Sequence, residues 1–507
     1  MPPASADKTI VCRFGSSATN DIDLLVIPWF EDDTADAVRG LDAATGGEVS
    51  RALTTREFQA KPYDLFLAGV ADKSFGARRV ALIGGGRRTD SGGDILRKLA
   101  TAAGLAGRQR RLSHVAFSVR GDGHRAELVQ AVAEGLTLAE FYGGSYKTTD
   151  PAPAAPPSWS IVVDGVAEDS TDAEAIAEAA QRGRVLGEAS NLARELANEP
   201  GNTLTPREFS DRCARIVSGA GVGVEILDEK QIADLGMGML LGVARGSSEP
   251  PRLMVFRYEP AGAPQTPVLG LVGKGITFDT GGISIKPAEG MERMKDDMAG
   301  GAAVACAMRA IGLLKPSIRV IGIVPTTENM PGGRAVKPGD ILRSAEGKTV
   351  EVINTDAEGR LILGDGLWYA RKLGATHLVD VATLTGACVV ALGKITSGLF
   401  GTPTTWVKQV RRVADRSGDR SWPMPLFDEY RDQLKSDIAD FTNTGGRPAG
   451  SITAAMFLKE FTGGLPWVHM DIAGTAWAED AKPYMPKGAT GIAVRTLASL
   501  AFEKFEV

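Results

Sequence analysis

Three segments of the chain carry acidic and basic side chains that could do chemistry together. The first, residues 272–286, combines Lys274, Asp279 and Lys286 with four glycines. Glycines let the backbone turn sharply and approach a ligand closely. A phosphate-binding loop does not fit, because its motif needs Ser or Thr after Gly-Lys, and Gly275 follows Lys274 here. Taken alone, the segment is equally compatible with surface lysines on a glycine-rich turn.

The second segment, residues 354–361, reads Asn-Thr-Asp-Ala-Glu-Gly-Arg-Leu and follows a predicted strand. If the chain stays extended, Asp356, Glu358 and Arg360 point to the same side. Two carboxylates held together raise each other's pKa unless a cation lies between them. A divalent metal ion would supply that charge. The alternative is an edge strand with alternating solvated charges.

The third segment, residues 294–304, places Asp296 and Asp297 before a run of small residues. An isolated aspartate there could simply interact favourably with the positive end of a helix dipole. Together, however, the three segments supply oxygen ligands without histidine or cysteine, a set that suits Mg²⁺, Mn²⁺ or Zn²⁺. The carboxylates suffice for a site with two metal ions.

These motifs resemble those of the leucyl aminopeptidase family, also called the cytosol aminopeptidase family or peptidase family M17. The octapeptide at residues 354–361 is similar to the family signature, and the other two segments resemble its lysine-aspartate and third metal segments. Further similar motifs lie at residues 198–202, 328–331, 445–448 and 469–476. The likeness covers residues 185–500, whereas the N-terminal third resembles the family only in length and α/β style.

The resemblance implies a metal centre with two ions. One ion would be held by Lys274, Asp279, Asp297 and Glu358, and the other by Asp279, Asp356 and Glu358. Lysine binds a metal only when neutral, and burial beside two cations would lower its pKa and displace the proton.

The resemblance also implies roles for residues around the metals. Lys286 would stabilise the oxyanion of a tetrahedral intermediate, and Arg360 would hold a bicarbonate ion that acts as general base. Met294, Thr383 and Gly386 would surround the pocket for the first side chain of the substrate.

The implied activity is a metal-dependent aminopeptidase that removes the N-terminal residue of peptides, preferably leucine or another hydrophobic residue. A water activated by two metal ions would attack the peptide bond. Mn²⁺ is the first expectation for the metal, with Zn²⁺ or Mg²⁺ as alternatives and bicarbonate as a further cofactor. The resemblance further implies a homohexamer.

The alternative function is a DNA-binding or architectural role, because some bacterial members of this family have one. Basic clusters at residues 108–111 and 411–420 would be its footprint. The net charge of −5 and the lack of a recognised helix-turn-helix pattern argue against it as the main role.

The elements that must position these residues alternate between strands and helices, which predicts an α/β fold. The length of the chain, 507 residues, predicts more than one domain. We expect a smaller N-terminal α/β domain over residues 1–168 and a larger C-terminal catalytic domain over residues 169–507, with a mixed central sheet flanked by helices. Residues 169–198 form the expected linking helix.

Apolar runs predict the individual elements. Strands are expected at residues 24–28, 80–83, 114–119, 160–163, 223–227, 252–258, 268–272, 319–324, 349–353 and 377–382. Helices are expected at residues 96–106, 126–141, 171–197, 298–314 and 364–373.

The amino-acid composition indicates the cellular compartment in which the protein is expected to work. Four cysteines without CxxC spacing favour a reducing compartment. The N-terminus lacks a secretory pattern and no run approaches 18 uninterrupted apolar residues, so we expect a cytoplasmic protein without a membrane span. None of the four histidines lies in an HExxH motif. His469 is expected to be a hydrogen-bonded structural residue, and Asp471 to support the site.

Overall fold

The computed structural model describes residues 9–14, 22–90, 92–149 and 155–505. The chain divides into two compact units, one of residues 1–191 with 480–486 and one of residues 192–479 with 487–507. The helix α5 (Thr171–Asn198) continues from the first unit into the second. A two-domain α/β fold is therefore confirmed, while the boundary at residue 168 stays a prediction.

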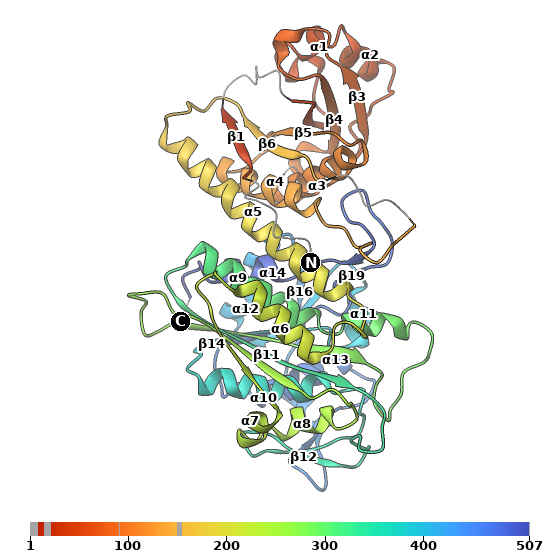
Figure 1. Cartoon of the computed structure of the whole chain (residues 1–507), viewed down its shortest axis with the longest axis vertical. Coiled ribbons are helices and arrows are strands. Elements are labelled where there is room, and N and C mark those ends of the chain that lie inside the picture. The colour runs from red at the N-terminus through yellow and green to blue at the C-terminus, as the bar shows by residue number, and fades with distance from the viewer. Residues whose placement is uncertain (1–8, 15–21, 91, 150–154, 506–507) are drawn as a thin grey trace. The chain divides into compact units, whose positions relative to one another are not determined.

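The N-terminal unit is built on a six-stranded sheet in the order β1-β6-β5-β2-β4-β3, parallel except for β3 (Figure 1). Its strands are β1 (Val11–Phe14), β2 (Leu24–Phe30), β3 (Leu65–Gly69), β4 (Arg79–Gly86), β5 (His114–Ser118) and β6 (Ser158–Val163). Its shorter helices are α1 (Leu41–Ala44) and α2 (Glu48–Thr54), and its longer ones are α3 (Gly93–Gln109) and α4 (Arg125–Leu138). One apolar core contains residues of α3 and α4, and the other contains residues of α1 and α2.

The second unit contains a nine-stranded mixed sheet in the order β16-β15-β18-β14-β9-β11-β8-β7, and β10 also pairs with β11. The central strands are β9 (Val268–Gly273), β10 (Gly275–Asp279), β11 (Arg319–Asn329), β14 (His377–Ala382) and β18 (Trp467–Asp471). The outer strands are β7 (Gly223–Leu227), β8 (Arg252–Tyr258), β15 (Ser397–Thr402) and β16 (Ser421–Pro423). The central strands β9, β11, β14 and β18 are parallel to their neighbours among these four and are almost wholly buried, which explains why they read as continuous apolar runs.

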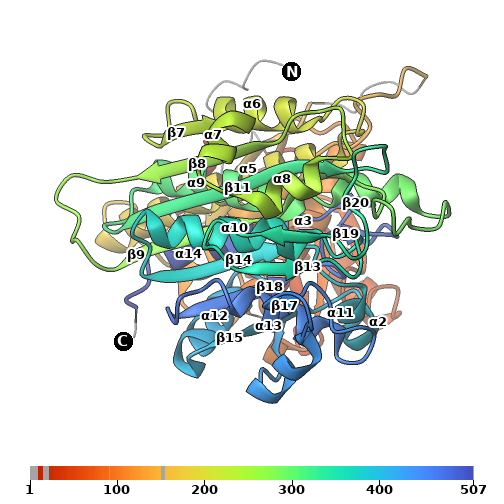
Figure 2. The same ribbon diagram turned by 90° about the horizontal axis from the view of Figure 1, so that it is seen from below.

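Helices cover both faces of this sheet. One face carries α6 (Pro206–Val217), α9 (Ala299–Leu314), α12 (Thr404–Arg416) and α14 (Val494–Leu500). The other carries α7 (Glu229–Asp234), α8 (Gly238–Ala244), α10 (Gly359–Lys372) and α13 (Gly450–Lys459), and α8 and α10 lie over β11 and β14 in the view from below (Figure 2). Short strands complete the unit, namely β12 (Ile341–Arg343), β13 (Thr349–Glu351), β17 (Phe441–Thr442), β19 (Trp477–Ala478) and β20 (Gly488–Ala489).

The small residues of α9 allow it to pack directly on the sheet. A Cβ added at Gly300 would collide with the backbone of Val381, and one added at Gly301 would come 2.7 Å from a side-chain carbon of Val324. The stretch Met291–Leu314 is also long and apolar enough to cross a membrane, but 78% of its most apolar window is buried inside the protein. Such burial is typical of a core helix.

The strand predicted at residues 349–353 is present but shorter, and the chain does not stay extended through residues 354–360. The strand β13 ends at Glu351 and belongs to a small separate sheet with β12 and β17. The Asn354 side chain accepts a hydrogen bond from the Asp356 N–H at 2.9 Å, which closes a local turn instead of a strand. The helix predicted from residue 364 already begins at Gly359.

Candidate functional site

The charged residues singled out in the sequence lie at the ends of central strands and at the starts of helices. Lys274 stands between β9 and β10, and Asp279 is the last residue of β10. Asp297 directly follows a short 3₁₀ helix and precedes α9, while Glu358 precedes α10. Strand ends of this kind are the usual place for ligands in α/β proteins.

Three carboxylates converge in this region. Asp279, Asp356 and Glu358 each offer an oxygen atom within 4.8 Å of the others. Asp279 and Glu358 are buried, and Asp356 is partly exposed. The Lys286 ammonium lies between two of them, 2.9 Å from Asp279 Oδ2 and in an ion pair with Asp356.

Lys274 joins a fourth carboxylate to the cluster. Its Nζ lies 2.7 Å from Asp297 Oδ2 and 2.9 Å from Glu358 Oε1, and it donates a hydrogen bond to the Thr383 carbonyl at 3.2 Å. The structure thus brings together all five residues expected to hold metal ions, together with Lys286.

The electrostatics of the cluster follow from its burial. Burial raises the pKa of Asp297 well above its usual range. Burial, opposed by Lys286 and reinforced by Glu358, raises the pKa of Asp356 to about 6. Burial alone would lower the pKa of Lys274, but Asp297 and Glu358 outweigh it and hold that pKa above its ordinary value.

These properties fit a divalent cation. Several buried carboxylates so close together need positive charge between them, and oxygen atoms are the ligands that Mg²⁺ and Mn²⁺ prefer. The donor set, with one lysine nitrogen among carboxylate oxygens, therefore suits a hard or borderline metal ion.

Arg360 is a buried cation in the first turn of α10. Its side chain donates one hydrogen bond, from Nη1 to the Asn443 carbonyl at 3.0 Å, and its Nε has no partner among the described residues. Burial lowers its pKa to about 10. A buried guanidinium with an unpartnered donor is suited to hold a small anion.

The three residues expected around the substrate pocket lie in different elements. Thr383 follows β14, and its hydroxyl donates to Asp297 Oδ1 at 2.7 Å. Gly386 begins α11 (Gly386–Leu392), and a side chain added there would meet no atom within 4 Å. Met294 is half-buried in the 3₁₀ helix that ends one residue before Asp297.

Two asparagines support the site without having been assigned a role from the sequence. Asn329 ends β11, and its amide donates to Asp279 Oδ1 at 2.8 Å and, more weakly, to Glu358 Oε2 at 3.4 Å. A polar residue at the end of a long buried strand was the available signal for it.

Asn443 is the second such residue. Its amide oxygen accepts from the N–H groups of Ile353 at 2.8 Å and Asn354 at 3.3 Å. Its amide nitrogen donates to the carbonyls of Asn354 at 2.7 Å and Ala357 at 3.3 Å. Asn443 therefore fixes the turn that carries Asp356, and no local pattern pointed to it.

His469 is a buried, hydrogen-bonded residue, as predicted. Its Nδ1 lies 2.6 Å from Asp380 Oδ1, and Trp467 donates to the other oxygen of the same carboxylate at 2.6 Å. All three side chains are buried in neighbouring strands.

Several arginines of the two basic clusters have partners within the protein. Arg108 donates to the carbonyls of Ala139 and Phe141. Arg412 and Arg416 both pair with Glu503. These contacts do not favour the DNA-binding alternative.

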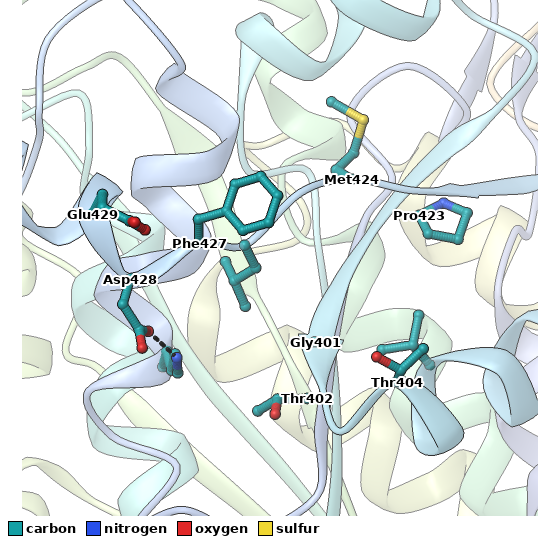
Figure 3. Close-up of a pocket in the computed structure, with 11 residues that line it drawn as sticks. Gly401, Thr402, Thr404, Pro423, Met424, Phe427, Asp428 and Glu429 are labelled. Carbon is teal, nitrogen blue, oxygen red and sulfur yellow. Dashed lines mark hydrogen bonds and ion pairs between the residues drawn. The ribbon is translucent and has the colours of Figure 1, made fainter.

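A pocket of about 830 Å³ lies elsewhere in the second unit (Figure 3). Thr402, Met424 and Phe427 contribute to its wall, and an ion pair of 2.7 Å between Lys459 and Asp428 lies at its edge. None of the clustered carboxylates or lysines lines this pocket. Its size alone does not make it the site of chemistry.

Comparisons with known proteins show which family and which relatives the chain is similar to. The family model for the catalytic domain of the cytosol aminopeptidase family matches residues 191–498, and the model for the N-terminal domain of that family matches residues 26–150. A probable cytosol aminopeptidase of Solibacter usitatus is 47% identical over 95% of this chain and 97% of its own. One of Koribacter versatilis is 51% identical over 74% of this chain and 72% of its own.

Two solved structures have a similar fold. A mutant of tomato leucine aminopeptidase superposes with a TM-score of 0.86 at 31% identity, covering 99% of this chain and 98% of that one. The bottromycin maturation enzyme BotP in complex with Mn superposes with a TM-score of 0.81 at 33% identity, covering 94% of this chain and 99% of that one.

Proposed function

Because the chain belongs to the cytosol aminopeptidase family, it is an aminopeptidase, and we propose that two divalent metal ions drive its reaction. We further propose that it prefers peptides beginning with leucine or another hydrophobic residue. The observation that carries the proposal is the convergence of Asp279, Asp356 and Glu358 within 4.8 Å. Two lysines beside them make the cluster resemble a binuclear site in which one lysine is a ligand.

In this proposal Lys274, Asp279, Asp297 and Glu358 hold one ion, and Asp279, Asp356 and Glu358 hold the other. When bound, the two ions would polarise the scissile carbonyl and acidify the attacking water. Mn²⁺ is the first candidate, supported by the Mn complex of BotP, and Zn²⁺ or Mg²⁺ are alternatives.

The other side chains act on charge that develops during the reaction. Lys286 has a pKa held above its ordinary value, because Asp279 and Glu358 outweigh the effect of burial, so it stays cationic and can stabilise an oxyanion. The buried Arg360 would hold bicarbonate as the general base. Thr383, Gly386 and Met294 would surround the first side chain of the substrate.

The cellular compartment and the oligomeric state are part of the same proposal. We infer a cytoplasmic enzyme that acts on peptides, supported by the naming of its relatives as cytosol aminopeptidases. We further propose that it assembles as a homohexamer. A DNA-binding role is not favoured.

The test is the release of leucine from leucinamide by full-length protein stripped of metal with a chelator. Activity is expected only after Mn²⁺ is added back, and N-acetyl-leucinamide should stay intact because its blocked amine cannot bind a metal. No cleavage with Mn²⁺, Zn²⁺ or Mg²⁺ in folded protein would contradict the proposal.

The pH dependence gives a second check. The substrate amine, with an ordinary pKa of about 7.7–8.0, must lose its proton before it can act as a ligand. We therefore expect kcat/KM for leucinamide to rise from pH 6 to pH 9. A flat profile over that range would argue against binding through the amine.

A further inference from the structure

Asp471 is a fully buried carboxylate at the end of β18 that has no place among the proposed metal ligands. Its Oδ2 accepts a hydrogen bond from the Thr385 hydroxyl at 2.7 Å. Its Oδ1 accepts from the N–H groups of Leu384 at 3.3 Å and Ala473 at 3.1 Å. Two of these three donors belong to one short segment, residues 383–386, that joins β14 to α11.

The same segment contacts two of the expected metal ligands. The Thr383 hydroxyl donates to Asp297 Oδ1 at 2.7 Å, and the Thr383 carbonyl accepts from Lys274 Nζ at 3.2 Å. Asp471 holds the two residues that follow Thr383. A displacement of the segment would therefore move the partners of Lys274 and Asp297 together.

Thr385 also fixes the start of α11. Its hydroxyl accepts from the Cys388 N–H at 3.0 Å as a helix N-cap while it donates to Asp471. The helix begins at Gly386, which borders open space. One hydroxyl thus ties the helix start to the buried carboxylate, beside the space proposed for the first side chain of the substrate.

We propose that Asp471 and Thr385 are positioning residues that, through residues 383–386, set the selectivity for the first residue and hold the Lys274–Asp297 side of the metal centre. Hydrogen bonds to a carboxylate are stronger than those between neutral groups, so Asp471 is well suited to hold this segment. Its effect on selectivity rests on the proposed function, whereas its effect on metal binding does not require peptide cleavage.

The experiment compares Thr385→Val with Thr385→Ser in the full chain. Valine has nearly the shape of threonine but lacks both hydrogen bonds, and serine keeps them. Mn²⁺ affinity is measured by calorimetry on chelator-treated protein, and selectivity as the ratio of kcat/KM for leucinamide to that for alaninamide. Thr385→Val should weaken Mn²⁺ binding about 10-fold and lower the ratio about fivefold. Thr385→Ser should recover both quantities to within about twofold of the wild type.

Each outcome decides the matter. In folded Thr385→Val, a wild-type Mn²⁺ affinity would overturn the role in holding the metal centre, and a wild-type ratio would overturn the role in selectivity. A wild-type chain that binds no Mn²⁺ would overturn the proposal as a whole. If the wild type binds Mn²⁺ but cleaves neither amide, the proposed function fails, and the affinities of the two variants still test the positioning role.

Asp471→Asn covers the case in which circular dichroism shows that Thr385→Val does not fold. This substitution keeps the shape of the side chain but replaces one accepting oxygen with an amide. The same loss of Mn²⁺ affinity is expected, and wild-type affinity would overturn the proposal.

Discussion

A single amide group in Asn329 connects Asp279 and Glu358, the two carboxylates proposed to bind both metal ions. The amide donates a hydrogen bond to Asp279 Oδ1 at 2.8 Å, which orients that carboxylate. Its weaker contact with Glu358 Oε2 at 3.4 Å restricts the position of the second carboxylate. Groups of this kind commonly change metal affinity by 10–100-fold when they are removed. We therefore expect Asn329→Ala to weaken Mn²⁺ binding by about that factor, as measured by calorimetry.

Asn198→Ala is the matched control for this substitution. The Asn198 amide donates to the carbonyl of Arg194 at 2.7 Å within the same unit, and it makes no hydrogen bond with the clustered carboxylates. Its removal should leave Mn²⁺ affinity unchanged. Equal affinities in the two variants would mean that Asn329 does not orient the ligands.

The residues of the carboxylate cluster could be singled out from the sequence, because they occur in short motifs next to apolar strands, and their roles as ligands came from the resemblance of those motifs to the family's. The supporting roles of Asn329 and Asn443 could not be predicted, because they depend on tertiary contacts. Asn443 reaches the turn at residues 353–357 from about 90 residues away, and no local spacing encodes such a contact.

At the scale of the element, the chain leaves the extended conformation after Glu351 for a local reason. Two-residue alternation indicates that side chains share a face only while the chain remains extended. The side chain of Asn354 offers the backbone a competing hydrogen bond, and α10 begins at Gly359. Asp356 and Glu358 still converge, but through a turn and a helix start.

Asp365 shows how a helix can hold a neighbouring element. Its carboxylate, fully buried in α10, accepts from the N–H groups of Met239 and Leu240 at 3.1 and 3.0 Å and of Ala345 at 2.9 Å. Burial outweighs these donors and raises its pKa to about 7. The folded state therefore keeps a proton that the unfolded state releases above about pH 4.

Linkage then gives the sign of the pH effect. Because the folded state binds more protons, the contribution of Asp365 to stability falls as the pH rises from about 4 to 7, by an amount on the order of 4 kcal/mol. We expect Asp365→Asn to lower the free energy of unfolding at pH 5. Because asparagine cannot ionise, we also expect the variant to lose less of its free energy of unfolding than the wild type when the pH rises from 5 to 8. Urea titrations of both proteins at the two pH values test this, and an identical loss in both would refute it.

At the scale of the whole molecule, alternating strands and helices indicated the two-domain α/β fold, and the buried parallel strands were the easiest to locate. Several outer elements were missed, including β1, β3, β15 and β16. Strands of this kind are short or contain Gly and Pro, so their sequences carry little apolar periodicity. They become strands because a longer neighbour offers hydrogen bonds, as the eight-residue β4 does for the five-residue β3.

The two units also differ in what can stabilise them. Each has its own apolar core, so we expect heat to unfold the chain in two steps. All the proposed metal ligands lie in the second unit. Mn²⁺ at about 100 times its dissociation constant should stabilise that unit by about 2.7 kcal/mol, which corresponds to a rise in Tm of about 5 °C.

Scanning calorimetry with and without a chelator measures this shift, and tryptophan fluorescence follows the unfolding of both units. Trp29 and Trp159 lie in the N-terminal unit, whose transition should not respond to Mn²⁺. Trp406 and Trp467 are buried in the second unit and should report the transition that moves. If both transitions moved together, the units would unfold as one cooperative body. If neither moved, the carboxylate cluster would not bind the ion in the folded state.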